Sequence, residues 1–99
     1  MAETNPKVIR LNIGCGPDLR SELDGWLNID LWQFESWVIP IDLEGGKLPF
    51  EDNSVDEVCA THVLEHINNL IPLMNECHRV LKSEGFIYIE VPHFPHTNA

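Results

Sequence analysis

Short apolar runs alternate with polar turns along most of this chain. Runs of four to six apolar residues bounded by glycine, proline, aspartate or asparagine are typical of buried strands. The pattern predicts five of them, over residues 8–13, 26–31, 38–43, 55–60 and 86–91. One stretch has a helical period instead, with apolar side chains recurring at Leu70, Leu73, Met74, Cys77 and Leu81. Strands joined by turns and a helical crossover predict a mostly parallel α/β sheet.

Several residues set the expected limits of these elements. Asn68 or Asn69 is expected to cap the start of the helix, and Gly85 lies just beyond its expected end. Pro40 has no N–H for a sheet hydrogen bond, so the third strand is expected at an edge. Residues 18–25 can hold only one or two helical turns. We expect a single domain over residues 1–99, with 1–7 as a leader and 93–99 as a tail.

Charge and cysteine content narrow the class of protein. The net charge is −10 with only six lysines and arginines, which argues against nucleic-acid partners and anionic membrane surfaces. Three cysteines at wide spacing form no C-x-x-C pair, and no long apolar segment is present. This composition favours the reducing cytoplasm.

Residues that could bind a ligand or take part in a reaction lie at the ends of the predicted strands. Gly14 and Gly16 break the chain directly after the first strand, and their lack of a Cβ lets a ligand approach the backbone. Asp30 and Asp42 end the second and third strands, and a carboxylate can accept two hydroxyl hydrogen bonds from a ribose. Ligands of parallel sheets bind at this carboxyl edge. The same edge should hold a further set of side chains: Thr61, His62 and His93.

Four stretches, in the order of the family, resemble class I S-adenosylmethionine-dependent methyltransferases. The resemblance is greatest to the small proteins of this class that are described as predicted methyltransferases. The four stretches are Leu11-Asn12-Ile13-Gly14-Cys15-Gly16-Pro17, Trp26-Leu27-Asn28-Ile29-Asp30, Leu48-Pro49-Phe50-Glu51-Asp52-Asn53-Ser54-Val55-Asp56, and His62-Val63-Leu64-Glu65-His66-Ile67 with Arg79-Val80-Leu81-Lys82 and Gly85. The resemblance implies a Rossmann-like sheet of order 3-2-1-4-5 with flanking helices. The family fold continues with further strands, which we expect this chain to lack.

The resemblance also implies roles for individual residues in binding S-adenosylmethionine. Gly14, Cys15 and Gly16 would pass under its methionine part, and Asp30, followed by Leu31, would hold the ribose. Asp42 would accept a hydrogen bond from the adenine amino group, and Leu43 would pack against the adenine ring. Thr61 and His62 would lie beside the methionine part and the reacting methyl. His62 or His93 would serve as a base for some acceptors. The acceptor would be a small molecule or a protein.

This sequence departs from the family pattern at two positions. Asn12 stands where an acidic residue is frequent, and Asp18 stands where a third glycine is frequent. The first change weakens the expected contact to the amino group of the cofactor. The second leaves the turn less open.

Other functions compete for the same residues. His62-Val63-Leu64-Glu65-His66 matches the H-x-x-E-H pattern of some zinc hydrolases, in which both histidines bind the metal. A nicotinamide-dependent reductase would need a third glycine at Leu19. A non-catalytic module that binds the cofactor, or acts only as a partner, would also fit the short chain.

The last predicted strand is expected to lie at an open edge of the sheet. Residues 86–91 are apolar and lack lysine, so they are expected to form an open sheet edge that pairs with a second copy of the chain. Core or interface packing is expected of Trp26, Trp32 and Trp37, with an aromatic ligand wall as the alternative. Core packing is expected of Cys77. Carboxylates such as Glu44 and Glu57 are expected on a solvated surface.

Overall fold

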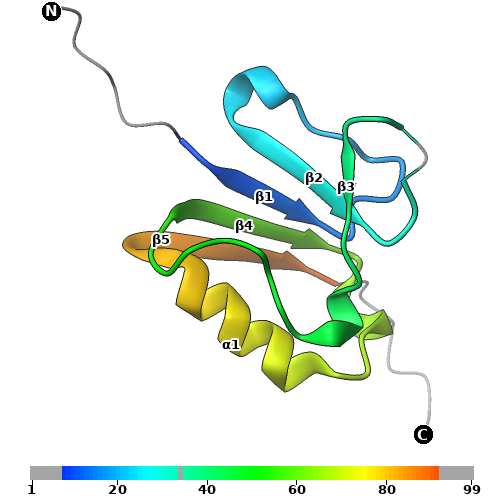
Figure 1. Ribbon diagram of the computed structural model, residues 1–99. Coiled ribbons are helices and arrows are strands. Elements are labelled where there is room, and N and C mark those ends of the chain that lie inside the picture. Colours follow the sequence, from blue (N-terminus) through cyan, green and yellow to red (C-terminus); the bar gives the residue numbers. More distant parts are fainter. Residues whose placement is uncertain (1–7, 34, 92–99) are drawn as a thin grey trace, which may run out of the picture.

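The computed structural model describes residues 8–33 and 35–91, which form one parallel five-stranded sheet. Its strand order is β3-β2-β1-β4-β5, which confirms the predicted Rossmann-like topology (Figure 1). The strands are β1 (Arg10–Ile13), β2 (Trp26–Asp30), β3 (Val38–Pro40), β4 (Val55–Thr61) and β5 (Leu81–Glu90). The helical elements are α1 (Leu70–Val80) and three short 3₁₀ turns, η1 (Glu22–Asp24), η2 (Leu43–Gly45) and η3 (Leu64–His66). Within the described ranges, none of these helices is long and apolar enough to cross a bilayer.

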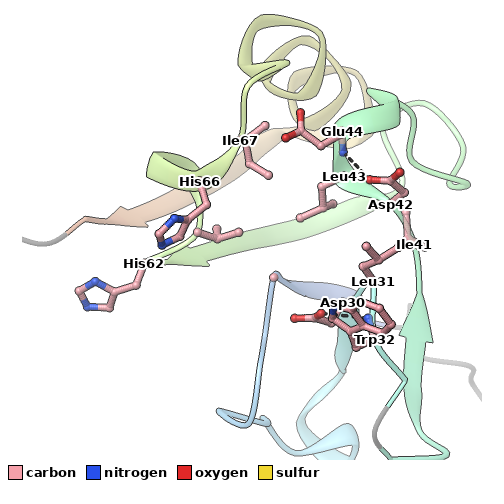
Figure 2. Close-up of a pocket in the computed structure, with 12 residues that line it drawn as sticks. Asp30, Leu31, Trp32, Ile41, Asp42, Leu43, Glu44, His62, His66 and Ile67 are labelled. Carbon is pink, nitrogen blue, oxygen red and sulfur yellow. Dashed lines mark hydrogen bonds between the residues drawn. The ribbon is translucent and has the colours of Figure 1, made fainter.

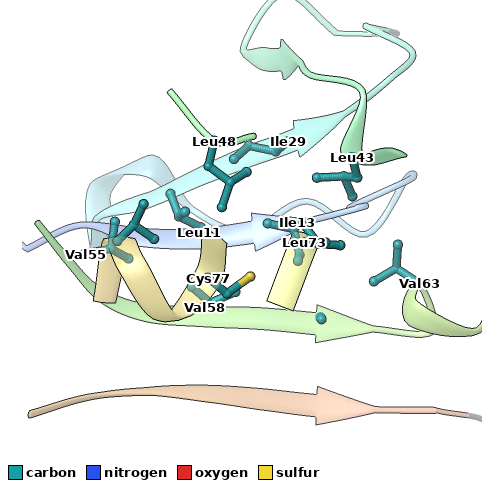
Figure 3. Close-up of a cluster of buried hydrophobic side chains, with 12 residues drawn as sticks. Leu11, Ile13, Ile29, Leu43, Leu48, Val55, Val58, Val63, Leu73 and Cys77 are labelled. Atoms are coloured by element: carbon teal, nitrogen blue, oxygen red, sulfur yellow. The ribbon is translucent and has the colours of Figure 1, made fainter. Parts of the chain in front are cut away.

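The hydrophobic core lies between one face of the sheet and α1. Leu11 of β1 is in register with Val58 of β4, and both are fully buried. Leu73 and Cys77 of α1 are buried in the same cluster (Figure 3). Burial raises the pKa of the Cys77 thiol to about 11, so this cysteine behaves as a core side chain, as predicted.

The opposite face of β1 and β2 is covered by a loop, where a buried amide network takes the place of apolar packing. The side chain of Asn28 is fully buried, and its Oδ1 accepts hydrogen bonds from Asn12 Nδ2 and from the Arg20 N–H, both at 2.9 Å. Its Nδ2 donates to the Arg20 carbonyl at 2.9 Å. The Arg20 guanidinium stacks over the Trp26 ring at 4.8 Å from its centroid. These bonds fix the link after β1, which contains only the short turn η1, as expected.

Several predicted boundaries are wrong: the first strand begins at Arg10 instead of residue 8, and the last begins at Leu81 instead of residue 86. At the third strand and the helix, the chain leaves its element earlier than predicted. The third strand ends at Pro40 because Asp42 caps η2, which begins at Leu43. As predicted, the strand is an edge strand. The helix ends at Val80, so Leu81 already belongs to β5 and pairs with Val55. The register between β4 and β5 shifts before Phe86.

The start of α1 is capped differently from the prediction. Asn69 is the N-cap residue, but its side chain makes no capping hydrogen bond to the helix. Its Nδ2 donates instead to the Glu44 carbonyl at 2.9 Å.

A charged cluster joins α1 to the segment before β4. Arg79 donates from Nε and Nη2 to both carboxylate oxygens of Glu76 at 2.8 Å, and from Nη1 to Asp52 at 2.6 Å. The Leu48 N–H also donates to Glu76 at 2.8 Å. The hydrogen bonds from Arg79, and then that from Leu48, lower the pKa of Glu76 to about 2.

Glu76 should therefore make folding sensitive to acid. Its carboxylate form is favoured in the folded state, so its contribution is complete above the ordinary pKa of 4.5. That contribution should disappear as the pH falls from about 4.5 to about 2. Glu76→Gln should lower the free energy of unfolding by about 1 kcal/mol at neutral pH. Urea unfolding between pH 2 and 7 measures this; Glu84→Gln, an exposed control, should follow the wild type. A Glu76→Gln difference that does not shrink toward pH 2 would contradict the assignment.

Candidate functional site

A cavity of about 460 Å³ opens at the carboxyl edge of the sheet, where β1, β2 and β4 end (Figure 2). This is the edge at which open parallel sheets bind their ligands. The volume is within the range of small-molecule sites. The lining residues are Gly14, Asp30, Leu31, Trp32, Ile41, Asp42, Leu43, Glu44, His62, Val63, His66 and Ile67.

The turn after β1 is shaped by two glycines in the left-handed region. Gly14 has φ +63°, and a Cβ at this position would overlap Cγ2 of Val63. Gly16 has φ +52°, but a Cβ there would meet no atom within 4 Å. The chain is therefore closely packed at Gly14 and open at Gly16, where a ligand can reach the backbone.

Asp30 holds this turn in place from the end of β2. Its Oδ2 accepts the Gly16 N–H at 2.8 Å, and its Oδ1 accepts the Trp32 N–H at 3.1 Å. In Figure 2 its carboxylate points toward the side of the cavity on which His62 lies. Each carboxylate oxygen can accept more than one hydrogen bond, so the group can brace the turn and still accept from a ligand.

Asp42 lies beyond β3 on the neighbouring wall. Its Oδ1 accepts the Glu44 N–H at 3.0 Å, which caps η2. Leu43, the first residue of η2, is buried and contributes to both the core and the cavity. The Ile41 N–H donates to the Asp30 carbonyl at 3.0 Å, so the two aspartates are held on adjacent backbone segments.

His62 follows β4 in a strained conformation at the mouth of the cavity. Its φ is +56°, which non-glycine residues rarely adopt outside sites that require it. Its N–H donates to the Glu90 carbonyl at 2.6 Å, and its Nε2 lies 3.3 Å from Glu90 Oε2. Tyr88 donates from its hydroxyl to the other oxygen of Glu90 at 3.0 Å. These contacts direct Nε2 toward β5 and leave Nδ1 outside the pair.

Most of the predicted site residues come together in this cavity. Six of them line it: Gly14, Asp30, Leu31, Asp42, Leu43 and His62. Cys15, Gly16 and Thr61 adjoin these residues but do not line it, and His93 lies outside the described residues. Cys15 is buried, and burial is the main reason that its pKa rises to about 11. Only its backbone is available to a ligand.

Sequence reasoning missed half of the lining. Trp32 was expected to pack in the core or at an interface, yet 74% of it is exposed and it borders the cavity, as the alternative of a ligand wall requires. Glu44 was predicted on a solvated surface and is indeed partly exposed, but its place in the cavity wall was not predicted. The position of Trp32 in the sequence could have predicted its place at the cavity, because it comes two residues after the aspartate that ends a strand. The contributions of Val63, His66 and Ile67 depend on the turn η3, which the sequence pattern did not predict.

The geometry does not support the zinc-hydrolase alternative. His62 precedes η3, a single 3₁₀ turn, so the α-helix that would place His62 and His66 on one face does not form. Over residues 8–33 and 35–91, no three His, Cys, Asp or Glu side chains gather as metal ligands would.

Comparison with known proteins identifies the family of this chain and a relative of part of it. A family model described as a methyltransferase domain matches residues 11–89. The uncharacterized protein MJ0638 of Methanocaldococcus jannaschii is 48% identical over 44 residues. That match covers 44% of this chain and 19% of the relative, so the chain spans only about a fifth of the relative's length.

Proposed function

Because the chain belongs to the methyltransferase-domain family, we propose that it binds S-adenosylmethionine in the cavity and passes a methyl group to an acceptor. The observation that carries this proposal is the glycine turn held by Asp30 at the carboxyl edge. Gly14 of this turn, a carboxylate that could accept ribose hydroxyls and an apolar wall line one cavity. These are the groups that a nucleoside with a polar tail requires.

The residues present fit this cofactor. The backbone at Gly14, Cys15 and Gly16 would face the methionine part, since Gly16 leaves open space beside it. Asp30 would accept the ribose hydroxyls, and Asp42 would accept the adenine amino group through Oδ2, because Oδ1 holds the Glu44 N–H. The apolar wall for the adenine would consist of Leu31, Trp32 and Leu43. Thr61 would adjoin the methionine part.

Methyl transfer depends mainly on positioning. When bound, S-adenosylmethionine supplies a methyl group that is already activated by its sulfonium. The chain would contribute a fixed place for the acceptor in line with that methyl. His62 would accept the proton of an acceptor at Nδ1, while Glu90 holds the ring through Nε2. His93 is the second proposed base. The acceptor would be a small molecule or a protein.

Isothermal titration of the chain with S-adenosylmethionine, and separately with S-adenosylhomocysteine, tests the proposal. Both should bind saturably with one site per chain. NAD, which shares the adenosine but adds a pyrophosphate, should bind at least ten-fold more weakly, because the described cavity lining contains carboxylates and no lysine or arginine. A folded chain that binds neither of the first two ligands would overturn the proposal.

The exposed edge of β5 is proposed to pair with a second copy of the chain. Among the described residues, β4 is the one strand that pairs with β5, and Phe86 and Tyr88 are 56% and 50% exposed. Analytical ultracentrifugation should show a dimer that dissociates on dilution. Phe86→Lys should shift the equilibrium toward the monomer, whereas Ile71→Lys, on exposed α1, should not. A wild type that stays monomeric at high concentration would contradict the pairing.

The cytoplasm remains the proposed location. The three cysteines are free and buried, as expected for a chain that folds in a reducing compartment.

A further inference from the structure

One carboxylate ties two walls of the cavity together. Glu44, in η2, accepts the Asn68 N–H through Oε2 at 3.0 Å and the Asn69 N–H through Oε1 at 2.8 Å. The Asn68 side chain adds a weaker bond at 3.3 Å. Figure 2 shows Glu44 beside Ile67, with the Asp42 carboxylate on its other side. The connection therefore spans from the wall that contains Asp42 to the wall that precedes α1.

This connection supplies a cap that α1 does not provide for itself. The Asn69 side chain donates to the Glu44 carbonyl and makes no capping hydrogen bond to the helix. Glu44 places a negative charge at the helix N-terminus, where the backbone dipole favours it. The bonds from Asn68, and then from Asn69, lower the pKa of Glu44 below its usual range.

Close packing at the same joint leaves the two segments little freedom. Gly46, directly after η2, has φ +66°, and a Cβ there would lie 2.8 Å from Cβ of Pro72 and 3.4 Å from Nδ2 of Asn69. The loop and the first turn of α1 thus approach as closely as glycine allows. The Glu44 carboxylate, which extends from η2 and accepts from the segment before α1 at this point, fixes the width of the cavity between Leu43 and Ile67.

We propose that Glu44 is a positioning residue for the ligand of this cavity. It holds the wall formed by Asp42 and Leu43 at its bound distance from the wall formed by His66 and Ile67, before the ligand arrives. The ligand then orders less of the chain on binding, which increases affinity. This inference rests on the proposed function, since it takes S-adenosylmethionine or its product as the ligand.

The charge of Glu44 should make this affinity depend on pH. The other titratable groups that line the cavity with it are Asp30, Asp42, His62 and His66. Within the described residues no lysine or arginine forms an ion pair with it. Since its folded pKa is lowered, both N–H bonds are complete above the ordinary glutamate pKa, and one of the two acceptor oxygens is lost as the pH falls through the lowered value. Glutamine has one acceptor oxygen, so it can hold only one of the two N–H groups at any pH.

Titration of S-adenosylhomocysteine into the wild type and Glu44→Gln tests the positioning role. The Kd should rise about ten-fold in the variant at neutral pH. The ratio of the two Kd values should shrink as the pH approaches the acid limit of folding. Amide hydrogen exchange at Asn68 and Asn69 should be faster in the ligand-free variant. Glu51→Gln, which removes an exposed carboxylate from the following loop, is the matched control and should bind like the wild type.

The outcomes separate the two proposals. A wild type that binds no S-adenosylhomocysteine overturns the proposed function and this inference with it. A wild type that binds, with a Glu44→Gln Kd within two-fold of it, overturns only the positioning role. If Glu44→Gln does not fold, Asn69→Ala removes the Glu44 carbonyl contact alone. That variant should bind two- to five-fold more weakly, and unchanged binding would overturn the inference.

Discussion

Replacement of Gly14 by alanine is expected to lower the free energy of unfolding by about 3 kcal/mol. The added Cβ costs about 1 kcal/mol because the backbone is left-handed at φ +63°. Its overlap with Val63 adds about 2 kcal/mol, since that side chain is buried in the core cluster and has little room to move. Urea unfolding monitored by tryptophan fluorescence measures the change.

Gly16→Ala is the matched control for this substitution. Gly16 is also left-handed, at φ +52°, but its added Cβ would meet nothing within 4 Å. The free energy of unfolding of the control should fall by only about 1 kcal/mol, which is the cost of the left-handed backbone. Adding Val63→Gly to Gly14→Ala should recover part of the loss relative to Val63→Gly alone. Equal losses for the two alanine variants would show that crowding at Val63 is not what makes Gly14 necessary.

The second large effect is expected at Asp30, on ligand binding. Asp30→Ala should raise the Kd for S-adenosylhomocysteine about 100-fold, or about 3 kcal/mol, because it removes the proposed acceptor for two ribose hydroxyls and releases the Gly16 N–H. Asp30→Asn keeps one acceptor oxygen and should lie between the alanine variant and the wild type. Calorimetric titration gives the Kd, and urea unfolding shows how much of each change reflects stability.

Asp24→Asn provides the control for charge. Asp24 is exposed on η1, away from the cavity, so its replacement changes the net charge by the same amount and should leave the Kd unchanged. Weaker binding of the same size in Asp24→Asn and Asp30→Asn would mean that overall charge, and not the place of Asp30 beside the glycine turn, controls affinity.

The sheet could be predicted from the sequence because its information is local. Apolar runs bounded by turn residues marked all five strands, and Asp30 was correctly placed at the end of the second of them. The end of α1 was not predictable in this way, since Leu81 continues the apolar period but pairs with Val55, far away in the sequence. The helical repeat of apolar residues cannot show at which residue the helix gives way to a strand that pairs with a distant part of the chain.

The missed parts of the site have the same origin. Glu44 looks like one surface carboxylate among many, and its place in the wall depends on backbone groups 24 and 25 residues later. The burial of Asn28 likewise depends on the carbonyl and N–H of Arg20 across a turn. Contacts of this kind join a side chain to distant backbone, and no residue pattern in a single sequence reports them.

The location of α1 has a consequence for how the chain folds. The core cluster around Leu11 and Ile29 is completed by α1, which begins only at Leu70, and Ile9 pairs with Asp56, 47 residues later. From the first half of the chain Leu43 and Leu48 join this cluster, but the side chains of β4 and α1 that complete it come only with the second half. Loop closure must precede most of the gain in burial, which favours slow, all-or-none folding without a stable N-terminal intermediate.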